Sequence, residues 1–180
     1  MSFLTLKSGA NEGGYKRTGK FAAALLALLV ISGCAQWKER KNVRDAVVRY
    51  NTLLADGYRK LNMGPVNEAA TEDIAARAFY HMAALGEARI KMDPALKSIT
   101  FSRIKLFSDK AEASTEEKWD YTYINLDTGK PEFQNSITYE MRYLLKKVNG
   151  RWLVAGVVSG KFKEKKDPRG IFFQRPAAKP

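Results

Sequence analysis

The stretch LLKKVNGRWLV at residues 144–154 predicts a β-hairpin, and the remaining elements follow outward from it. Asn149-Gly150 marks the turn, because both central positions of a type I′ turn need a positive φ, which Asn-Gly tolerates well. Apolar residues recur at every second position up to Leu145 and again from Trp152, which is the period of strands with one buried face. We therefore expect two antiparallel strands, 133–148 and 152–158.

Two further strands precede this hairpin. The segment 111–125 has one apolar face, made of Ala111, Ala113, Trp119, Tyr121 and Tyr123. Its other face carries Glu112, Glu116, Lys118 and Asp120. In the segment 99–107 the apolar parity changes between Phe101 and Ile104, which predicts a bulge or a strong bend. A turn at 126–131 completes an antiparallel meander of about four strands.

Helical periodicity covers the part of the chain before these strands. The segment 37–61 is the clearest helix, with an apolar stripe of Val43, Val47, Tyr50, Leu54, Tyr58 and Leu61. A second helical stretch starts at Pro65 and is expected to end by Asp93-Pro94, because a residue before proline is disfavoured in a helix. Helices followed by strands predict an α+β fold, with the N-terminal helices packed in a curved antiparallel sheet.

The hairpin, the strand with Trp119-Asp120-Tyr121 and the strand through 139–143 together resemble the last strands of a nuclear transport factor 2-like domain, also called a cystatin-like α+β cone. The resemblance covers roughly residues 38–158. This superfamily contains isomerases, dehydratases, ligand binders and noncatalytic interaction modules, so the resemblance implies the fold and no particular activity. Lipid-anchored accessory or assembly domains are the members that this chain most resembles.

An export signal precedes the domain. Lys16, Arg17 and Lys20 come before the uncharged run FAAALLALLVISG at 21–33, which is shorter than the roughly 20 residues that span a bilayer. The run ends in Ile31-Ser32-Gly33-Cys34, which resembles a bacterial lipobox. We expect cleavage between Gly33 and Cys34 and lipidation of Cys34; the alternative is a short membrane anchor with an incidental cysteine.

These features divide the chain into four parts and place it in the cell envelope. They are a signal peptide (1–33), the lipidated cysteine with a short tether (34–37), the α+β domain (38–158) and a basic, irregular tail (159–180). Ala35 after the cysteine resembles lipoproteins of the outer membrane that face the periplasm, with the inner membrane as the alternative. The net charge is +12, and the tail cations Lys161, Lys163, Lys165 and Lys166 are candidates for contact with anionic lipid or an acidic partner. Export argues against nucleic acid as a partner.

Titratable residues give no catalytic constellation. Cys34 is the only cysteine and His81 the only histidine, so a metal site built on several of these residues is excluded, and we expect no cofactor. His81 has no partner that the sequence can place. Asp120 lies on the strand face opposite Trp119 and Tyr121, so we expect it in solvent. The sequence predicts a protein that is not an enzyme.

An aromatic row on the predicted sheet leaves two interpretations open. Its members are Trp119, Tyr121, Tyr123, Tyr139 and Tyr143, together with Trp152. Aromatic side chains suit the core of a small sheet, but an open cone could use Trp119 and the four tyrosines to line a pocket for a small apolar ligand. The leading hypothesis is a noncatalytic accessory module with a protein partner; the alternative is a ligand-binding protein, or a weak enzyme, that uses the cone cavity.

Overall fold

The Asn149-Gly150 turn is formed, with φ values of 49° and 78°, and joins the strands β3 (Pro131–Val148) and β4 (Arg151–Lys165). The computed structural model describes the backbone of residues 18–165 and the side chains of residues 36–161. The strands β1 (Ile90–Leu106) and β2 (Lys110–Asn125) complete a four-stranded antiparallel sheet in the order β1-β2-β3-β4. This confirms the predicted antiparallel meander and, with the helices that precede it, the predicted α+β class.

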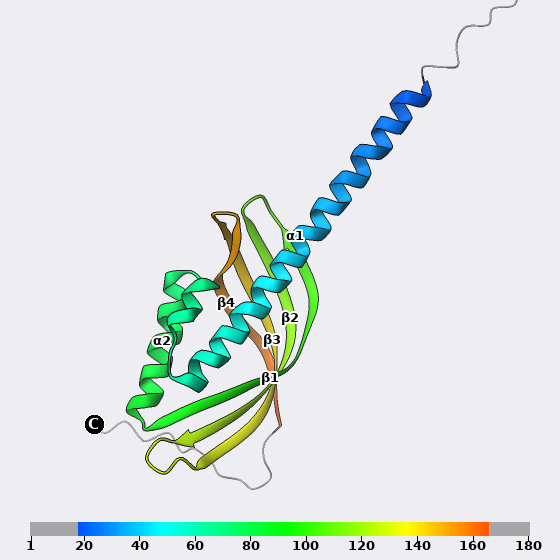
Figure 1. Cartoon of the computed structure of the whole chain (residues 1–180). Helices are drawn as coiled ribbons and strands as arrows, with labels where there is room; N and C mark the ends of the chain where they lie inside the picture. The colour runs from blue at the N-terminus through cyan, green and yellow to red at the C-terminus, as the bar shows by residue number, and fades with distance from the viewer. Residues whose placement is uncertain (1–17, 166–180) are drawn as a thin grey trace, which may run out of the picture. The chain divides into compact units, whose positions relative to one another are not determined.

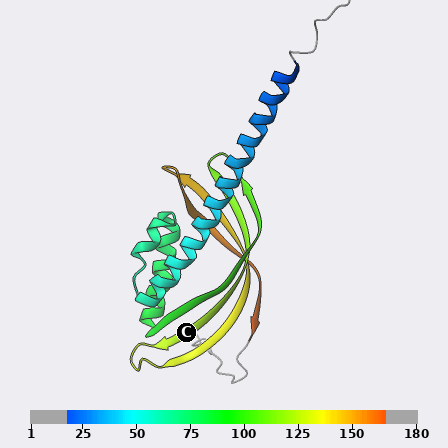
Figure 2. The same ribbon diagram turned by 45° about the vertical axis from the view of Figure 1, so that its right-hand side comes forward.

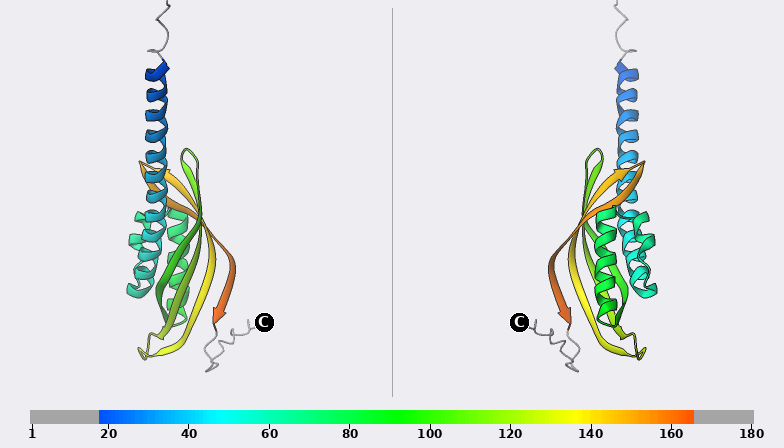
Figure 3. Two further views of the ribbon diagram at one scale, coloured as in Figure 1. Left: turned by 90° about the vertical axis from the view of Figure 1, so that its right-hand side faces the viewer. Right: turned by 90° about the vertical axis from the view of Figure 1, so that its left-hand side faces the viewer.

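Two α-helices and a short 3-10 helix precede the sheet. They are α1 (Thr18–Lys60), η1 (Gly64–Glu68) and α2 (Glu72–Glu87). The chain divides into two compact units between Lys38 and Glu39, so the domain uses α1 from Glu39 onward. There α1 and α2 lie on the concave side of the sheet, which curls around them (Figures 1, 2 and 3).

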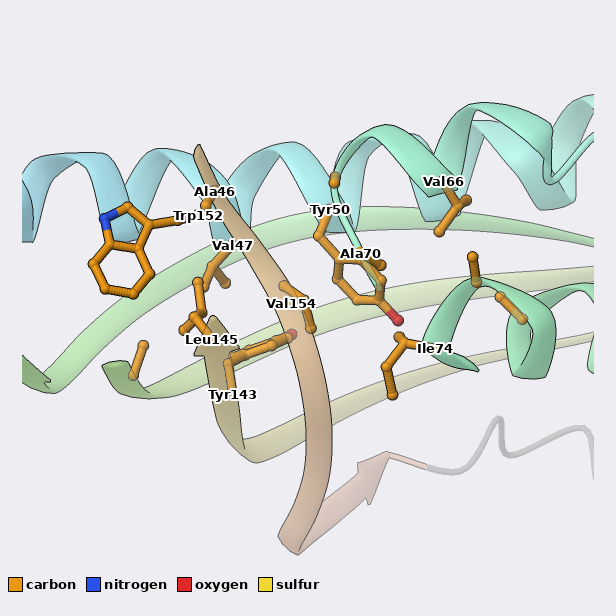
Figure 4. Close-up of a cluster of buried hydrophobic side chains, with 14 of the residues drawn as sticks. Ala46, Val47, Tyr50, Val66, Ala70, Ile74, Tyr143, Leu145, Trp152 and Val154 are labelled. Atoms are coloured by element: carbon orange, nitrogen blue, oxygen red, sulfur yellow. The ribbon is translucent and has the colours of Figure 1, made fainter. Parts of the chain in front are cut away.

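The core lies between these helices and the concave face. Val47 and Tyr50 of α1 pack against Tyr143, Leu145 and Val154 of the sheet (Figure 4). Val43 of α1 belongs to the same buried cluster. Tyr58 is buried as its place in the helical stripe predicts, whereas Leu54 is half-buried and Leu61 is exposed. Leu61 lies beyond the helix, with a φ of 54°, so it no longer follows the helical period.

The bulge predicted in the first strand is present. The register of β1 against β2 shifts between Phe101 and Arg103, and a further shift lies between Leu96 and Ser98. Each extra residue restores the apolar side chains to the concave face, because neighbouring residues of a strand point to opposite sides. Both bulges lie on an edge strand, where no second neighbour constrains the register.

Two predicted boundaries were wrong: the first strand begins before residue 99, and the first helix begins before residue 37. The second helix ends at Glu87, and β1 begins at Ile90, so Asp93-Pro94 lies inside a strand. The residue before proline favours extended backbone, which a strand supplies, and an edge strand tolerates the missing N–H of Pro94. In addition, α1 begins before the expected residue 37, at Thr18, because the run at 21–33 consists mostly of good helix formers.

The predicted irregular tail also starts too early. Strand β4 continues to Lys165, where it pairs with Ser136 of β3, and Lys163 pairs with Thr138. Backbone pairing does not require apolar side chains, so a basic sequence continues the strand when its neighbour is long enough. Lys166 and the rest of the tail lie outside the described residues.

Candidate functional site

Four of the five predicted pocket residues form a continuous aromatic row on the concave face. Ring centroids are 6.1 Å apart for Trp119 and Tyr121, and 6.5 Å apart for Tyr121 and Tyr123. Tyr139 meets Tyr121 edge-on, also at 6.5 Å. Trp119 is buried, and Tyr121 and Tyr123 pack against the core. Burial, with a smaller effect of Tyr139, raises the pKa of Tyr121 above its ordinary value.

Tyr143, the fifth predicted pocket residue, belongs to a different cluster. It is 1% exposed, meets the ring of Tyr50 edge-on at 6.2 Å, and donates its hydroxyl hydrogen to Oε1 of Glu117 at 2.7 Å. The Glu117 carboxylate is itself 1% exposed and accepts from two further groups at the same oxygen, Asn51 Nδ2 at 3.2 Å and Thr115 Oγ1 at 2.8 Å. We call Glu117 and its four hydrogen-bond donors the Glu117 network; the donors are Asn51, Thr115, Trp119 and Tyr143.

The second carboxylate oxygen is occupied as well. Oε2 of Glu117 accepts from Trp119 Nε1 at 2.9 Å. No Lys, Arg or His of the described residues forms an ion pair with Glu117, so dipolar donors alone compensate the buried acid. Burial is the main reason that the pKa of Tyr143 lies well above its usual range, and the neighbouring Glu117 raises it further. The network ties α1, β2 and β3 together, because Asn51, Glu117 and Tyr143 come from these three elements.

Sequence reasoning missed Glu117, although the signal was present. Glu117 has the parity of Ala113, Trp119 and Tyr121 on β2, so strict alternation puts it on the concave face. Both oxygens of this carboxylate are hydrogen-bonded, and the side chain is closed to solvent.

His81 and Asp120 lie apart from this network. Nδ1 of His81 is 2.6 Å from the hydroxyl of Tyr58, so the lone histidine has a partner that its sequence neighbours did not reveal. Asp120 lies on the opposite sheet face from Trp119, as the alternation predicts. There it accepts a hydrogen bond from Ser136 and is 3.8 Å from Lys97. Neither residue touches Glu117.

Two surface grooves are lined by described residues, and neither includes a predicted pocket residue. The larger, of about 690 Å³, runs between α1 and β1. It is lined by Arg40, Arg44, Phe101, Ser102, Arg103, Ile104, Lys105, Leu106 and Phe107. The smaller, of about 410 Å³, crosses the strands at Ser102, Ser114, Thr115, Glu116, Glu140, Met141, Arg142, Val158 and Gly160.

The remaining predicted sites fall at the edges of the described region. Lys161 is exposed on β4, and only the backbone of Lys163 and Lys165 is described. The predicted cleavage site at Gly33 and Cys34 lies within the span of α1, and its side chains are outside the described residues. Among the described residues, no helix is long and apolar enough to cross a bilayer. No cluster of acidic, His or Cys side chains suited to a metal ion was found in that same part.

Comparison with known proteins gives structural neighbours but no sequence relatives. The sequence matches no protein-family model and no curated protein. The fold is similar to the crystal structure of the intermembrane space region of the chloroplast protein ARC6, with a TM-score of 0.60 at 10% sequence identity. The similarity covers 66% of this chain and 94% of that chain. At this identity the likeness shows a shared fold alone.

Proposed function

We propose that this chain is a lipid-anchored accessory protein of the bacterial cell envelope, and that its nuclear transport factor 2-like domain binds a protein partner without catalysing a reaction. The observation that carries the proposal is the filling of the concave face, where an enzyme of this fold class would keep its cavity. Tyr143, Leu145 and Val154 are fully buried there, and the Glu117 carboxylate has no free oxygen. Catalysis needs titratable groups that converge on a space for substrate.

The lipid anchor rests on the sequence at 31–34. The positive stretch, the apolar run and Ile31-Ser32-Gly33-Cys34 follow one another in the order of a lipoprotein signal. Two or three acyl chains on Cys34 would hold the domain stably at a membrane, since each buried CH₂ contributes about 0.8 kcal/mol. Ala35 favours the outer membrane, facing the periplasm.

An exposed aromatic pair on α2 favours a protein partner. Phe79 and Tyr80 meet edge-on at 5.8 Å, and Tyr80 is 69% exposed. Large aromatic side chains are enriched at protein interfaces relative to other surfaces. The half-buried row of Tyr121, Tyr123 and Tyr139 supports the alternative, a small apolar ligand, less well, because its rings pack on one another and on the core.

The test is complementation of a strain that lacks the gene. We expect Phe79→Ala/Tyr80→Ala to lose function while it keeps wild-type stability, because the pair touches the partner rather than the core. His81→Gln and Asp120→Asn should complement fully. A well-folded His81→Gln or Asp120→Asn variant without function would contradict the noncatalytic proposal. Full function of the aromatic double variant would remove α2 as the contact surface.

A further inference from the structure

One end of the sheet carries exposed basic residues from three parts of the chain, which we call the basic end. It contains the turn between β1 and β2 and the turn between β3 and β4, whereas the turn between β2 and β3 lies at the opposite end (Figure 1). Its exposed cations include Arg40, Arg44, Arg103, Lys105, Lys110, Lys146 and Arg151. Four of them line the larger groove.

These cations are mostly without acidic partners. Of these seven, only Lys105 is in an ion pair within the described residues, with Glu112 at 3.5 Å. Beside them, Lys41 pairs with Asp45 and the half-buried Lys147 pairs with Glu39. Arg40 donates to the backbone oxygen of Ile104 at 3.3 Å, and Arg44 lies over the ring of Phe101 at 5.3 Å. Both interactions hold the guanidinium groups in place and leave their positive charge uncompensated.

The opposite end of the sheet is different. There Arg59 pairs with Asp56 at 2.7 Å and with Asp93 at 2.9 Å, and Arg89 pairs with Asp127. More of the positive charge is therefore paired at the opposite end than at the basic end, although Asp109 is exposed in the β1–β2 turn and Lys130 forms no ion pair within the described residues. This asymmetry points to an anionic surface on the side of the basic end.

Chain connectivity keeps Cys34 within reach of the same end. Glu39 binds Lys147 at 3.0 Å and Trp152 at 2.9 Å, beside the β3–β4 turn. Cys34 lies five positions before Glu39, and an extended chain of that length spans at most about 18 Å. Lys161, the first of the predicted tail cations, lies ten residues along β4 from Arg151, which is about 30 Å of strand. It is therefore not part of the basic end.

We propose that the basic end rests on anionic lipid headgroups of the membrane that holds Cys34, and so orients the domain. This inference depends on the proposed lipid anchor. Each basic residue near an anionic surface favours contact by a factor of about five, and the surface field extends over about 10 Å in ordinary salt. Phe107, exposed at the β1–β2 turn, adds an aromatic side chain suited to the interface.

Spin labels at the two ends of the sheet test the orientation. Cys34 is the only native cysteine, so once it is acylated a nitroxide on Ser108→Cys or Thr128→Cys is the only label. The lipidated protein is reconstituted in phosphatidylcholine vesicles with or without phosphatidylglycerol. We expect phosphatidylglycerol to shield the Ser108 label from a water-soluble relaxant and to leave the Thr128 label accessible, with the difference lost in 1 M salt.

A charge variant with a matched control identifies the residues. Arg40→Gln/Arg103→Gln/Arg151→Gln should reduce the preference for the oriented state about a hundred-fold, since three factors of about five are lost. The Ser108 label should then behave in anionic vesicles as it does in neutral ones.

The control removes the same charge at the opposite end, as Lys60→Gln/Arg89→Gln/Lys130→Gln, and should leave the Ser108 label shielded. A Ser108 label that is equally accessible in both vesicles, on protein whose mass shows acyl chains, overturns the inference and leaves the anchor intact. An acidic protein segment would then be the occupant of the basic end. Protein without acyl chains overturns both proposals.

Discussion

Removing one hydroxyl from the Glu117 network tests whether the network holds the fold together. Tyr143→Phe keeps the ring against Tyr50 and deletes only the group that donates to Glu117 at 2.7 Å. A hydrogen bond to a charged group contributes about 1.5–3 kcal/mol, and the loss is felt fully where water cannot replace the donor. At 1% exposure the Glu117 side chain has no such replacement. We therefore expect the free energy of unfolding to fall by about 1.5–3 kcal/mol.

The assay is urea unfolding followed by tryptophan fluorescence, with the midpoint and slope fitted together. Tyr80→Phe is the matched control, because Tyr80 is largely exposed and its hydroxyl has no partner among the described residues. Its effect should stay within about 0.5 kcal/mol. Equal stabilities of the two variants would refute the reasoning, since they would mean that the buried carboxylate gains nothing from Tyr143.

Three further predictions concern the core, the turn and alkaline pH. Leu145→Ala, at 2% exposure, should lower the free energy of unfolding by about 2–5 kcal/mol in urea titrations, and its neighbour Leu144→Ala, at 39% exposure, clearly less. Gly150→Ala should destabilise the protein by about 1–2 kcal/mol, because the φ of Gly150 is +78°. Gly86→Ala should stabilise it by about 0.5–1 kcal/mol, because Gly86 lies within α2 with open space around it. Melting curves of the two variants check both signs. Burial, followed by the charge of Glu117, raises the pKa of Tyr50 to about 12 from 10. The unfolded state therefore loses this proton first, so the free energy of unfolding falls as the pH rises from 10 to 12, by up to about 1.4 kcal/mol per pH unit. Urea unfolding of Tyr50→Phe across this range should show a shallower fall than the wild type, and identical slopes would contradict the assignment.

The strand meander was predictable because its signals are local. Asn149-Gly150 specifies its turn through two φ values, and the parity change between Phe101 and Ile104 specifies a bulge, without any knowledge of the rest of the fold. The first half of β1 was not predictable in this way. Asp93-Pro94 reports only that the backbone is not helical there, and whether it forms a strand depends on the partner β2, which lies far along the chain.

The candidate site shows the same limit. Alternation places Trp119, Tyr121 and Asp120 on their correct faces, and applied strictly it also places Glu117 inside. What it cannot give is the partner set, because Asn51 and Tyr143 lie 66 and 26 residues from Glu117 in the sequence. The basic end likewise depends on α1, β1 and β4 meeting at one end of the sheet, so its cations appear in the sequence as unrelated single residues.

The intact mass of the detergent-extracted protein tests the central claim most directly. That claim is that a lipid on Cys34 holds the domain at a membrane. We predict a chain that begins at Cys34 and carries two or three acyl chains, and a Cys34→Ser variant that keeps residues 1–33 and carries none. An unmodified wild-type Cys34 thiol in the membrane-extracted protein would contradict the account.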